Sequence, residues 1–507
     1  MMMSQLKIGA LLSYVVLALN NLLGLLYTPY LLRMLGKSEY GLYSIAASII
    51  AYLTVLDLGF GNAIVRYTAK YRAEGKHEEQ YKMFGIFFLL YCCIGLVAAG
   101  LGCFFAFNTD IFFKEAMTAL ELERVRVLVI LMVMNLAVTF PLSLFTSIVT
   151  AYEQFIFSKS LNIVRIILNT LTMVVLLQFG YKAVALAVVA SLFNVLTLLA
   201  NLFYCKFKLK IKMKFGHVDW SFLKEISIYS FWIFLNAIID RIYWSTGQFV
   251  LGAFVGTAAV AVFAVAIQLE HMYMAFSTAI TSVFLPKVTA IVSNTANSDD
   301  EVSSLFIKTG RIQFCILALI LSGFALFGKQ FVVLWAGEGY TEAYIITMIF
   351  FIPLTVPLIQ TLGITILQAR NQMRFRSLLY LAISVVSLIL QFILTKLHGI
   401  VGCAWAIGAS LILGHGIIMN VYYQKKQRIN ILRFWNEILR MARTPLIVAV
   451  ITYIILKRVC LDSPMLLLIG ILCYLSVYLP LFFLFSMNEY EKKLVLNPMR
   501  KLVHKIC

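Results

Sequence analysis

The stretch TFPLSLFTSIVTAYEQFIF, residues 139–157, is echoed later in the chain by TVPLIQTLGITILQARNQMRF, residues 355–375. Pro141 aligns with Pro357 at an offset of 216, and Phe157 aligns with Phe375 at an offset of 218. In both places one apolar segment ends, the chain turns, and another apolar segment begins. Self-similarity at a steady offset marks a duplicated structural unit. The sequence therefore predicts two related halves.

Two shorter matches extend the repeat. Leu19-Asn20 returns as Leu235-Asn236, and Ala190–Leu192 returns as Ala409–Leu411. Each half then holds six apolar segments. Because six is even, both halves have the same orientation in a membrane, as in transporters with parallel repeats.

Composition predicts the fold class. The 507 residues are 62% hydrophobic and only 13% charged, whereas a soluble protein has about 25% charged residues. Mean hydropathy is +0.92. Apolar stretches of about 20 residues, enough to cross a bilayer as a helix, recur along the whole chain. We therefore expect an all-α polytopic membrane protein with fourteen transmembrane helices, arranged as two six-helix lobes and two extra C-terminal helices.

The expected spans have approximate ends. They run over residues 8–32, 39–63, 83–106, 127–149, 160–179, 183–205, 226–253, 258–285, 312–335, 343–368, 377–395, 400–423, 444–460 and 464–486. The predicted domains are an N-terminal lobe over 1–215, a C-terminal lobe over 216–425, and a third part over 426–507. The third part contains an interfacial helix, the last two spans and a cytoplasmic tail.

The formal net charge of +19 has two readings. In a soluble protein it would suggest nucleic acid. Here, if the N-terminus is cytoplasmic, 30 of the 42 Lys and Arg residues lie on the inner side of the predicted spans and 9 on the outer side. This is the bias of membrane proteins. It predicts a multi-pass protein of the bacterial inner membrane with both termini in the cytoplasm, an uncleaved first span, and no nucleic-acid partner.

Several other classes of protein are disfavoured. The nine cysteines form no CxxC pair and lie mostly within apolar stretches, so we interpret them as small core residues and expect no metal site. No Walker A loop, HExxH motif or nucleophile elbow occurs. The Gly59-Phe60-Gly61 stretch favours close helix packing or a helix break. We expect a transporter, without catalytic residues or a cofactor.

The N-terminal stretch YLLRMLGKSEYGLYSIAASIIAYLTVLDLGFGNAIVRYTAKY, residues 30–71, carries a resemblance to a known family. Its Leu35-Gly36, Tyr40-Gly41, Leu56–Gly59 and Arg66-Tyr67 elements resemble those of the Wzx-type polysaccharide flippases. These belong to the multidrug/oligosaccharidyl-lipid/polysaccharide (MOP) exporter superfamily. The duplicated six-span halves and two extra spans extend the resemblance over the chain.

The resemblance implies a function and partners. Such flippases move undecaprenyl-diphosphate-linked oligosaccharide repeat units from the cytoplasmic to the outer leaflet by alternating access. The exported sugar becomes O-antigen, capsule or another surface polysaccharide. The polysaccharide polymerase and glycosyltransferases of the same pathway are expected partners, besides the bilayer. Two lobes already form a pathway, so we expect a monomer, driven by a Na⁺ or H⁺ gradient or by the membrane potential.

Charged residues within spans cost about 2.5–3.5 kcal/mol each on insertion scales, so each needs a reason. Asp240 and Arg241 lie near the middle of the seventh span, and Glu270 and His271 near the middle of the eighth. Arg241 is a candidate for the substrate diphosphate, because guanidinium suits phosphate. Asp240, Glu270 and His271 are candidates for a coupling cation or proton. The alternative is a structural Arg241–Glu270 bridge.

Polar stripes give further candidates. Asn236 shares a helical face with Asp240, Tyr243 and Gly247, while Asp240 and Arg241 point about 100° apart and are not expected to neutralise each other. On the fifth span, Asn162, Arg165 and Asn169 share a face that would contact substrate, or Arg165 would reach the headgroups instead. The fourth span carries a stripe that would bind sugar or join helices; its members are Asn135, Thr139, Ser143, Thr146 and Thr150.

The remaining candidates lie in the first two spans. Asp57 belongs to the family-like stretch and is a candidate for cation or proton coupling, or for capping and packing. Arg66 is a candidate substrate contact, and Asn20 would face the pathway. The loop Lys206–Lys214 alternates basic and apolar residues and would bind anionic headgroups or only fix topology. Residues Leu432–Arg443 predict a short interfacial helix.

Two other functions remain open. A MATE-like, cation-coupled exporter of small molecules would share the architecture, and it predicts an acidic pathway, which Asp240 and Glu270 would supply. A membrane polysaccharide polymerase would need a large outer loop, and the short loops and the duplication disfavour it.

Overall fold

The computed structural model describes residues 2–215, 220–281, 298–370, 372–458 and 463–494, with single residues at 288, 291 and 496. These residues form helices and turns, without a strand. They belong to two compact units. Unit 1 comprises Met1–Ala264 with Leu388–Cys403, and unit 2 comprises Val265–Ser387 with Ala404–Cys507. The expected all-α class is confirmed.

Unit 1 contains the first nine helices of the chain. They are α1 (Met2–Leu53), α2 (Phe60–Ala73), α3 (His77–Phe107), α4 (Thr109–Phe113), α5 (Ala119–Ala151), α6 (Phe155–Gln178), α7 (Ala183–Phe203), α8 (Trp220–Trp244) and α9 (Thr246–Phe254). A 3₁₀ turn, Thr54–Asp57, lies between α1 and α2, and a π-helical turn, Tyr204–Lys208, follows α7. The long helix α10 (Thr257–Thr281) begins in this unit.

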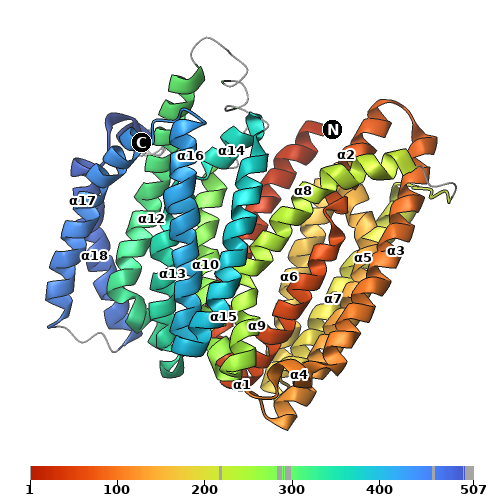
Figure 1. The fold of residues 1–507 in the computed structure, drawn as a ribbon, viewed down its shortest axis with the longest axis horizontal. Helices are drawn as coiled ribbons and strands as arrows, with labels where there is room; N and C mark the ends of the chain where they lie inside the picture. The colour runs from red at the N-terminus through yellow and green to blue at the C-terminus, as the bar shows by residue number, and fades with distance from the viewer. Residues whose placement is uncertain are drawn as a thin grey trace, which may run out of the picture. The chain divides into compact units, whose positions relative to one another are not determined.

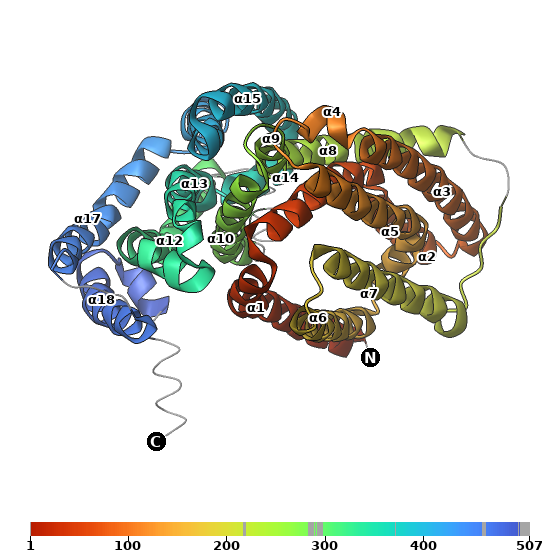
Figure 2. The ribbon, with the colours of Figure 1, turned by 90° about the horizontal axis from the view of Figure 1, so that it is seen from below.

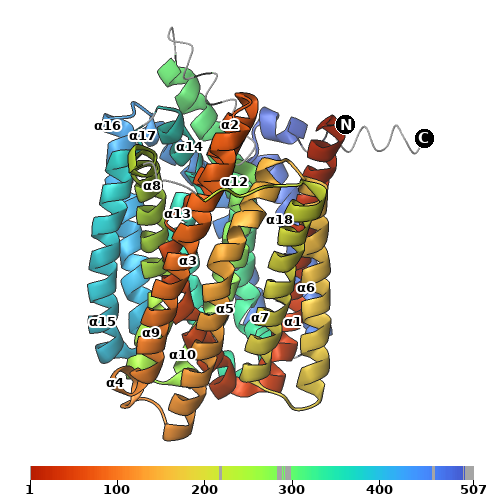
Figure 3. The same cartoon turned by 90° about the vertical axis from the view of Figure 1, so that its right-hand side faces the viewer.

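Helix α5 is the centre of unit 1, since it packs along α3 on one side and α7 on the other (Figure 3). Helix α6 packs along α1, and seen end-on these helices form a ring of neighbours (Figure 2). An aromatic core that includes Phe60, Phe87, Tyr91 and Phe140 joins α2, α3 and α5. A capping box between Thr118 and Glu121 starts α5. Burial of large aromatic side chains is the main source of packing energy here.

Unit 2 contains the remaining helices, except that Leu388–Cys403 of α15 belongs to unit 1. They are most of α10, α12 (Ser298–Ala336), α13 (Glu342–Ile359), α14 (Leu362–Ala369), α15 (Met373–Leu411), α16 (Met419–Lys425), α17 (Ile431–Leu456) and α18 (Pro464–Phe485). A 3₁₀ turn, Glu338–Tyr340, precedes α13, and a π-helical turn, Ile412–Ile418, precedes α16. Helix α12 packs against α13, α17 and α18 (Figure 1).

The expected number of spans is confirmed. Eleven helical stretches in the described ranges are long and apolar enough to cross a membrane. Two of them, Ile8–Ala73 and Met373–Lys425, contain a non-helical glycine, Gly36 and Gly399, so each makes two crossings. Helices α8 and α9 together make one more. The expected interfacial helix differs, because it continues into the next span as the single helix α17.

The duplication is visible in matching turns of the two units. In unit 1, the ring of Phe157 stacks on Tyr204 with centroids 3.9 Å apart, and in unit 2, the ring of Phe375 stacks on Tyr422 at 4.1 Å. The backbone N–H of Gln154 donates to Val149, and that of Gln372 to Leu367. All four pairs of equivalent positions are 218 residues apart. The two repeated halves therefore share individual ring contacts and backbone hydrogen bonds.

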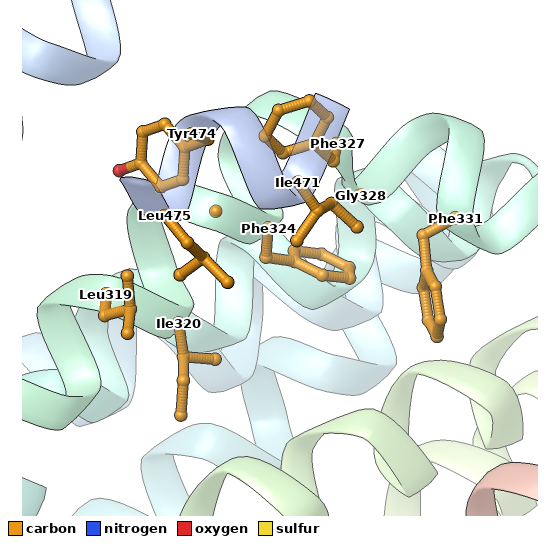
Figure 4. A pocket seen from close by; sticks show the side chains of 10 residues that line it. Leu319, Ile320, Phe324, Phe327, Gly328, Phe331, Ile471, Tyr474 and Leu475 are labelled. Carbon is orange, nitrogen blue, oxygen red and sulfur yellow. The ribbon is translucent and has the colours of Figure 1, made fainter. Parts of the chain in front are cut away.

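Two features of unit 2 stand apart from the repeat. A groove of about 250 Å³ lies between α12 and α18, lined almost wholly by apolar side chains such as Phe324 and Leu475 (Figure 4). Arg311 of α12 is only 6% exposed and forms ion pairs with Glu491 at 2.6 Å and Glu437 at 2.7 Å. These bonds hold α17 and the segment after α18 against α12.

The domain limits expected from the repeat, 215/216 and 425/426, stay a prediction. They describe the ancestry of the sequence, whereas the two units are defined by packing.

Candidate functional site

The second span is broken in its middle. Helix α1 ends at Leu53, the 3₁₀ turn covers Thr54–Asp57, and α2 begins at Phe60. Between them Leu58 and Gly59 both have left-handed backbone, with φ of 53° and 74°. A left-handed leucine costs about 1–2 kcal/mol, and such strain gathers at functional positions. Broken helices are also where transporters form ion and substrate sites. The sequence left close helix packing or a helix break open at Gly59–Gly61, and the structure shows a break at Gly59.

Asp57 lies at this break. The Tyr91 hydroxyl, which is fully buried, donates to Asp57 Oδ1 at 2.8 Å. The backbone N–H groups of Gly59 and Gly61 also donate to the carboxylate. A carboxylate is favourable at a helix N-terminus, where backbone N–H groups lack partners. Asp57 therefore accepts hydrogen bonds at the N-terminus of α2 and connects this helix to α3. These contacts agree with the capping and packing role that the sequence left open. A role in cation coupling stays a prediction.

Substitutions at Asp57 test the capping role. Asp57→Leu leaves the buried Tyr91 hydroxyl and two N–H groups without an acceptor, so we expect the free energy of unfolding to fall by about 1–3 kcal/mol. Asp57→Asn keeps one acceptor oxygen and should cost less. The measurement is thermal unfolding of the purified protein in detergent. Equal melting temperatures for the two variants would contradict the capping role.

The seventh span is also interrupted. Helix α8 ends at Trp244 and α9 begins at Thr246, with Ser245 between them. Tyr52, in the last turn before the break of the second span, pairs its hydroxyl with that of Thr246. A Cβ on Gly59 would overlap the side chain of Ile233 on α8. The two interrupted spans therefore pack against each other within unit 1.

Arg241 and Asp240 lie at this junction. The carbonyl of Arg241 accepts from the Tyr52 hydroxyl at 3.5 Å. The Arg241 side chain is 36% exposed, and its Nη1 lies 3.9 Å from Oδ2 of Asp240, which is 56% exposed. The two side chains were not expected to neutralise each other, and in the structure they form only a loose ion pair. The pair is too long and too exposed to neutralise Arg241, which can still bind an anion.

The predicted stripe on the seventh span is interrupted before Gly247. Asn236, Asp240, Tyr243 and Gly247 were expected on one continuous helical face. The interruption at Ser245 ends that face, and Tyr243 is buried while Asp240 is exposed. Asn236 is half-buried on α8.

In unit 2, Glu270 and His271 lie on α10. Glu270 is fully buried, and its Oε2 lies 3.3 Å from Nδ1 of His271, which is 53% exposed. A buried carboxylate beside an accessible imidazole is suited to carrying a proton. Arg241 belongs to unit 1, so the alternative Arg241–Glu270 bridge stays a prediction.

The fifth-span stripe lies on α6, with half-buried side chains. Nη2 of Arg165 donates to Oδ1 of Asn162 at 3.0 Å, and Nδ2 of Asn169 approaches the Met173 sulfur at 3.7 Å. The structure thus joins Arg165 to Asn162, and substrate contact by this stripe stays a prediction.

The fourth-span stripe joins helices. Asn194 of α7 donates to Asn135 at 3.0 Å and to Thr139 at 2.8 Å, and Asn201 of α7 donates to Thr146 at 3.1 Å. These bonds tie α5 to α7 along their length. Polar side chains in apolar surroundings hold neighbouring helices together in this way.

Arg66 and Asn20 are exposed on α2 and α1. The Arg66 guanidinium lies 5.8 Å from the centroid of the Tyr67 ring. Their roles as substrate contacts stay predictions.

The first part of the family-like stretch has a structural role. Glu39 is buried, pairs with Arg124 of α5, and accepts from the backbone N–H of Ala183 at the start of α7. Ser38 donates to Glu121 at 2.7 Å. These contacts fix the start of the second span on the first turns of α5 and α7.

Gly41 of the same stretch permits a close backbone approach. A Cβ at this position would overlap the carbonyl oxygen of Thr257, at the start of α10. We expect Gly41→Val to force these helices apart and destabilise the protein by about 1–3 kcal/mol or more. Gly100→Val is the matched control, because nothing lies near its Cβ. The yield of monodisperse protein and its melting temperature measure both, and a fully stable Gly41→Val would refute the close approach.

Several residues at these sites had no signal in the sequence. Tyr52, Tyr91, Thr246 and Asn194 are single polar groups in apolar segments, and only their partners give them a role. Among the described residues, no group of three or more His, Cys, Asp or Glu is placed to hold a metal ion.

Comparisons with known proteins fit this architecture. The chain is 22% identical over 405 residues to a putative O-antigen transporter of Shigella flexneri, covering 77% of this chain and 91% of that one. The fold is similar to the lipid II flippase MurJ in an inward closed conformation, with a TM-score of 0.72 and 16% identity over 94% of this chain and 98% of that one. It is also similar to an inward-facing multidrug resistance transporter of the MATE family and MOP superfamily. That TM-score is 0.59, with 14% identity over 81% of this chain and 98% of that one.

The sequence profile of one family, described as polysaccharide biosynthesis protein, matches residues 6–292. The match covers more than half of the chain, including the broken second span and the junction around Arg241. The protein is a member of the polysaccharide biosynthesis protein family.

Proposed function

We propose that this protein carries undecaprenyl-diphosphate-linked oligosaccharide units from the cytoplasmic to the outer leaflet of a bacterial inner membrane. The family membership, the similarity to an O-antigen transporter and the fold of a lipid II flippase support this function. The proposal assigns substrate binding to Arg241, because its partly exposed guanidinium lies at the junction of two interrupted spans.

The physical problem is the head of the cargo. Two phosphate charges and many hydroxyl groups cannot cross hydrocarbon unaided, whereas the lipid tail can remain in the bilayer. A guanidinium binds phosphate through two parallel hydrogen bonds. In this proposal Arg241 holds the diphosphate, and Asn236, Asn162, Arg165 and Asn169 contribute donors along the pathway. The two duplicated halves then expose the site to each side in turn.

The orientation follows from charge. We place the end that carries Arg66–Lys82 and Lys206–Lys214 in the cytoplasm, because inner loops are enriched in Lys and Arg. Both termini then lie in the cytoplasm. A monomer is proposed as the working unit, with the polymerase and glycosyltransferases of the pathway as transient partners.

Coupling is assigned to acidic groups. Asp57 at the broken second span, Asp240 beside Arg241, and Glu270 with His271 are the candidates for Na⁺ or H⁺. The membrane potential is the alternative driving force, since moving one charge across 100 mV supplies about 2.3 kcal/mol.

The test is a gene deletion in the host, with an assay of which leaflet holds the lipid-linked unit. We expect accumulation on the cytoplasmic leaflet and loss of surface polysaccharide, both rescued by wild type and not by Arg241→Ala. Normal leaflet distribution in a strain with no second flippase would reject the proposal.

A cation-coupled exporter of small molecules is the second candidate. It is favoured by one observation, the fully buried Glu270 beside an accessible His271, because buried carboxylates suit exchange of cations for protons. A deletion strain that keeps its polysaccharide but gains sensitivity to cationic compounds would place this function first.

A further inference from the structure

Residues 204–215, called here the basic strap, cross one end of unit 1. The strap begins with the π-helical turn Tyr204–Lys208, turns at Lys210 with a φ of 52°, and runs without regular structure to Phe215. Two backbone bonds fix it. The N–H of Ile211 donates to Cys205 at 3.0 Å, and the N–H of Lys214 donates to Tyr81 of α3 at 3.1 Å.

The strap has two different faces. Its alternate apolar residues, Leu209, Ile211 and Met213, pack against the aromatic core of unit 1. Five lysines before, between and after them are exposed: Lys206, Lys208, Lys210, Lys212 and Lys214. From Ile211 onward the strap has no helical turn, and successive side chains there point to opposite sides. Packing of the apolar face therefore presents the lysines outward as a row.

The row keeps most of its charge. Lys214 forms an ion pair with Glu78. Within the described part of the chain, no carboxylate lies within 4.0 Å of the other four ammonium groups. Exposed phenylalanines flank the row at Phe203, Phe207 and Phe215. Aromatic rings beside lysines are typical of the boundary between headgroups and hydrocarbon.

The matching segment of unit 2 keeps the same turn without a row of five lysines. Arg428 has a φ of 55°, like Lys210 at the position 218 residues earlier, and the N–H of Ile429 donates to Tyr423 at 3.0 Å. There Gln427 is buried and donates to Gln372 at 2.6 Å, and the chain continues into α17. The same turn is thus used for internal packing in unit 2. In unit 1 its outer face carries unpaired charge.

We propose that the basic strap binds the phosphate headgroups of anionic phospholipids in the leaflet at its end of the bundle. The proposal rests on the cytoplasmic orientation given above, because that leaflet carries the negative surface. A fixed row of lysines with flanking aromatic rings matches a negatively charged sheet of headgroups better than it matches one soluble anion. Bound lipid would hold the strap at the membrane surface.

The experiment uses the full chain, purified in a neutral detergent. Its melting temperature is followed while phosphatidylglycerol, phosphatidylcholine or inorganic phosphate is added. We expect a rise with phosphatidylglycerol alone, which fades at high salt because surface charges are screened. In the triple variant Lys208→Gln, Lys210→Gln, Lys212→Gln the apparent affinity for phosphatidylglycerol should fall about tenfold or more.

The control removes the same charge elsewhere. Lys114→Gln, Lys182→Gln and Lys396→Gln alter three exposed lysines that fall on the outer side of the predicted spans and should leave the lipid effect unchanged. An equal loss in this control, a wild-type effect that persists at high salt, or an equal effect of inorganic phosphate would overturn the proposal. The salt series needs no variant, so it decides even if the triple variant fails to fold. Because the readout is lipid binding, a protein that binds lipid here but moves no cargo would refute the proposed function alone.

Discussion

Arg241→Ala should slow flipping of the lipid-linked unit by about 10- to 150-fold, because a hydrogen bond to a charged group contributes about 1.5–3 kcal/mol. The side chain is 36% exposed and its pair with Asp240 is 3.9 Å long. A loose, exposed ion pair adds little to stability. The variant should therefore fold normally and fail in transport, which separates a substrate contact from a structural one.

Two variants sharpen this result. Arg241→Lys keeps the positive charge but cannot form the bidentate hydrogen bonds of a guanidinium to phosphate, so it should retain part of the transport activity. Arg126→Ala, the matched control, removes a guanidinium paired with exposed Asp110 at 3.2 Å on another part of unit 1 and should transport normally. The measurement is the rate of leaflet transfer at equal amounts of folded protein. A wild-type rate for Arg241→Ala would remove Arg241 from the pathway.

Arg311→Leu should lower the free energy of unfolding by about 3–5 kcal/mol, because it leaves a buried carboxylate without its counter-charge. Glu491 is only 3% exposed, and both of its oxygens accept from Arg311, at 2.6 and 2.9 Å. Arg311 also donates to the carbonyl of Ser486 at 3.2 Å. Loss of these bonds should release the segment after α18 from α12.

A double variant tests whether the unpaired charge of Glu491 causes the loss of stability. Arg311→Leu combined with Glu491→Leu removes both charges and should recover much of the loss. Arg440→Leu is the control, since Arg440 is 61% exposed and lies 3.7 Å from Glu437, and it should cost little. Melting temperature in detergent gives all three values. If the single and double variants melt together, the buried ion pair is not the source of the stability.

Hydropathy and the internal repeat were enough to predict the architecture. Fourteen crossings and a duplicated half follow from the length of the apolar stretches and from the Pro141 and Pro357 match, because a bilayer demands about 20 apolar residues per helix. A break at Gly59 was one of the two interpretations that the sequence left open, since glycine is the residue that left-handed backbone accepts at least cost.

The interruption at Ser245 could not be predicted, because no Gly or Pro precedes it and its cause is a partner far away in sequence. Tyr52 meets Thr246 across 194 positions. The burial of Arg311 could not be predicted either, because it depends on Glu491, 180 residues later. Tertiary partners of this kind leave no periodic signal. For the same reason, the sequence could not decide between sugar binding and helix joining for the fourth-span stripe. The structure shows that Asn194 of α7 bonds to it.

Movement of lipid-linked oligosaccharide between leaflets can be measured with the purified protein alone. Purified protein is placed in sealed vesicles with a fluorescent undecaprenyl-diphosphate oligosaccharide, and the label on the outer surface is destroyed at intervals. We expect the label that begins on the inner leaflet to reach the outer surface and be destroyed rapidly with wild-type protein. With Arg241→Ala, or without protein, this loss of label should be slow. An inner pool that stays protected equally with wild-type protein and with empty vesicles would contradict the proposed function.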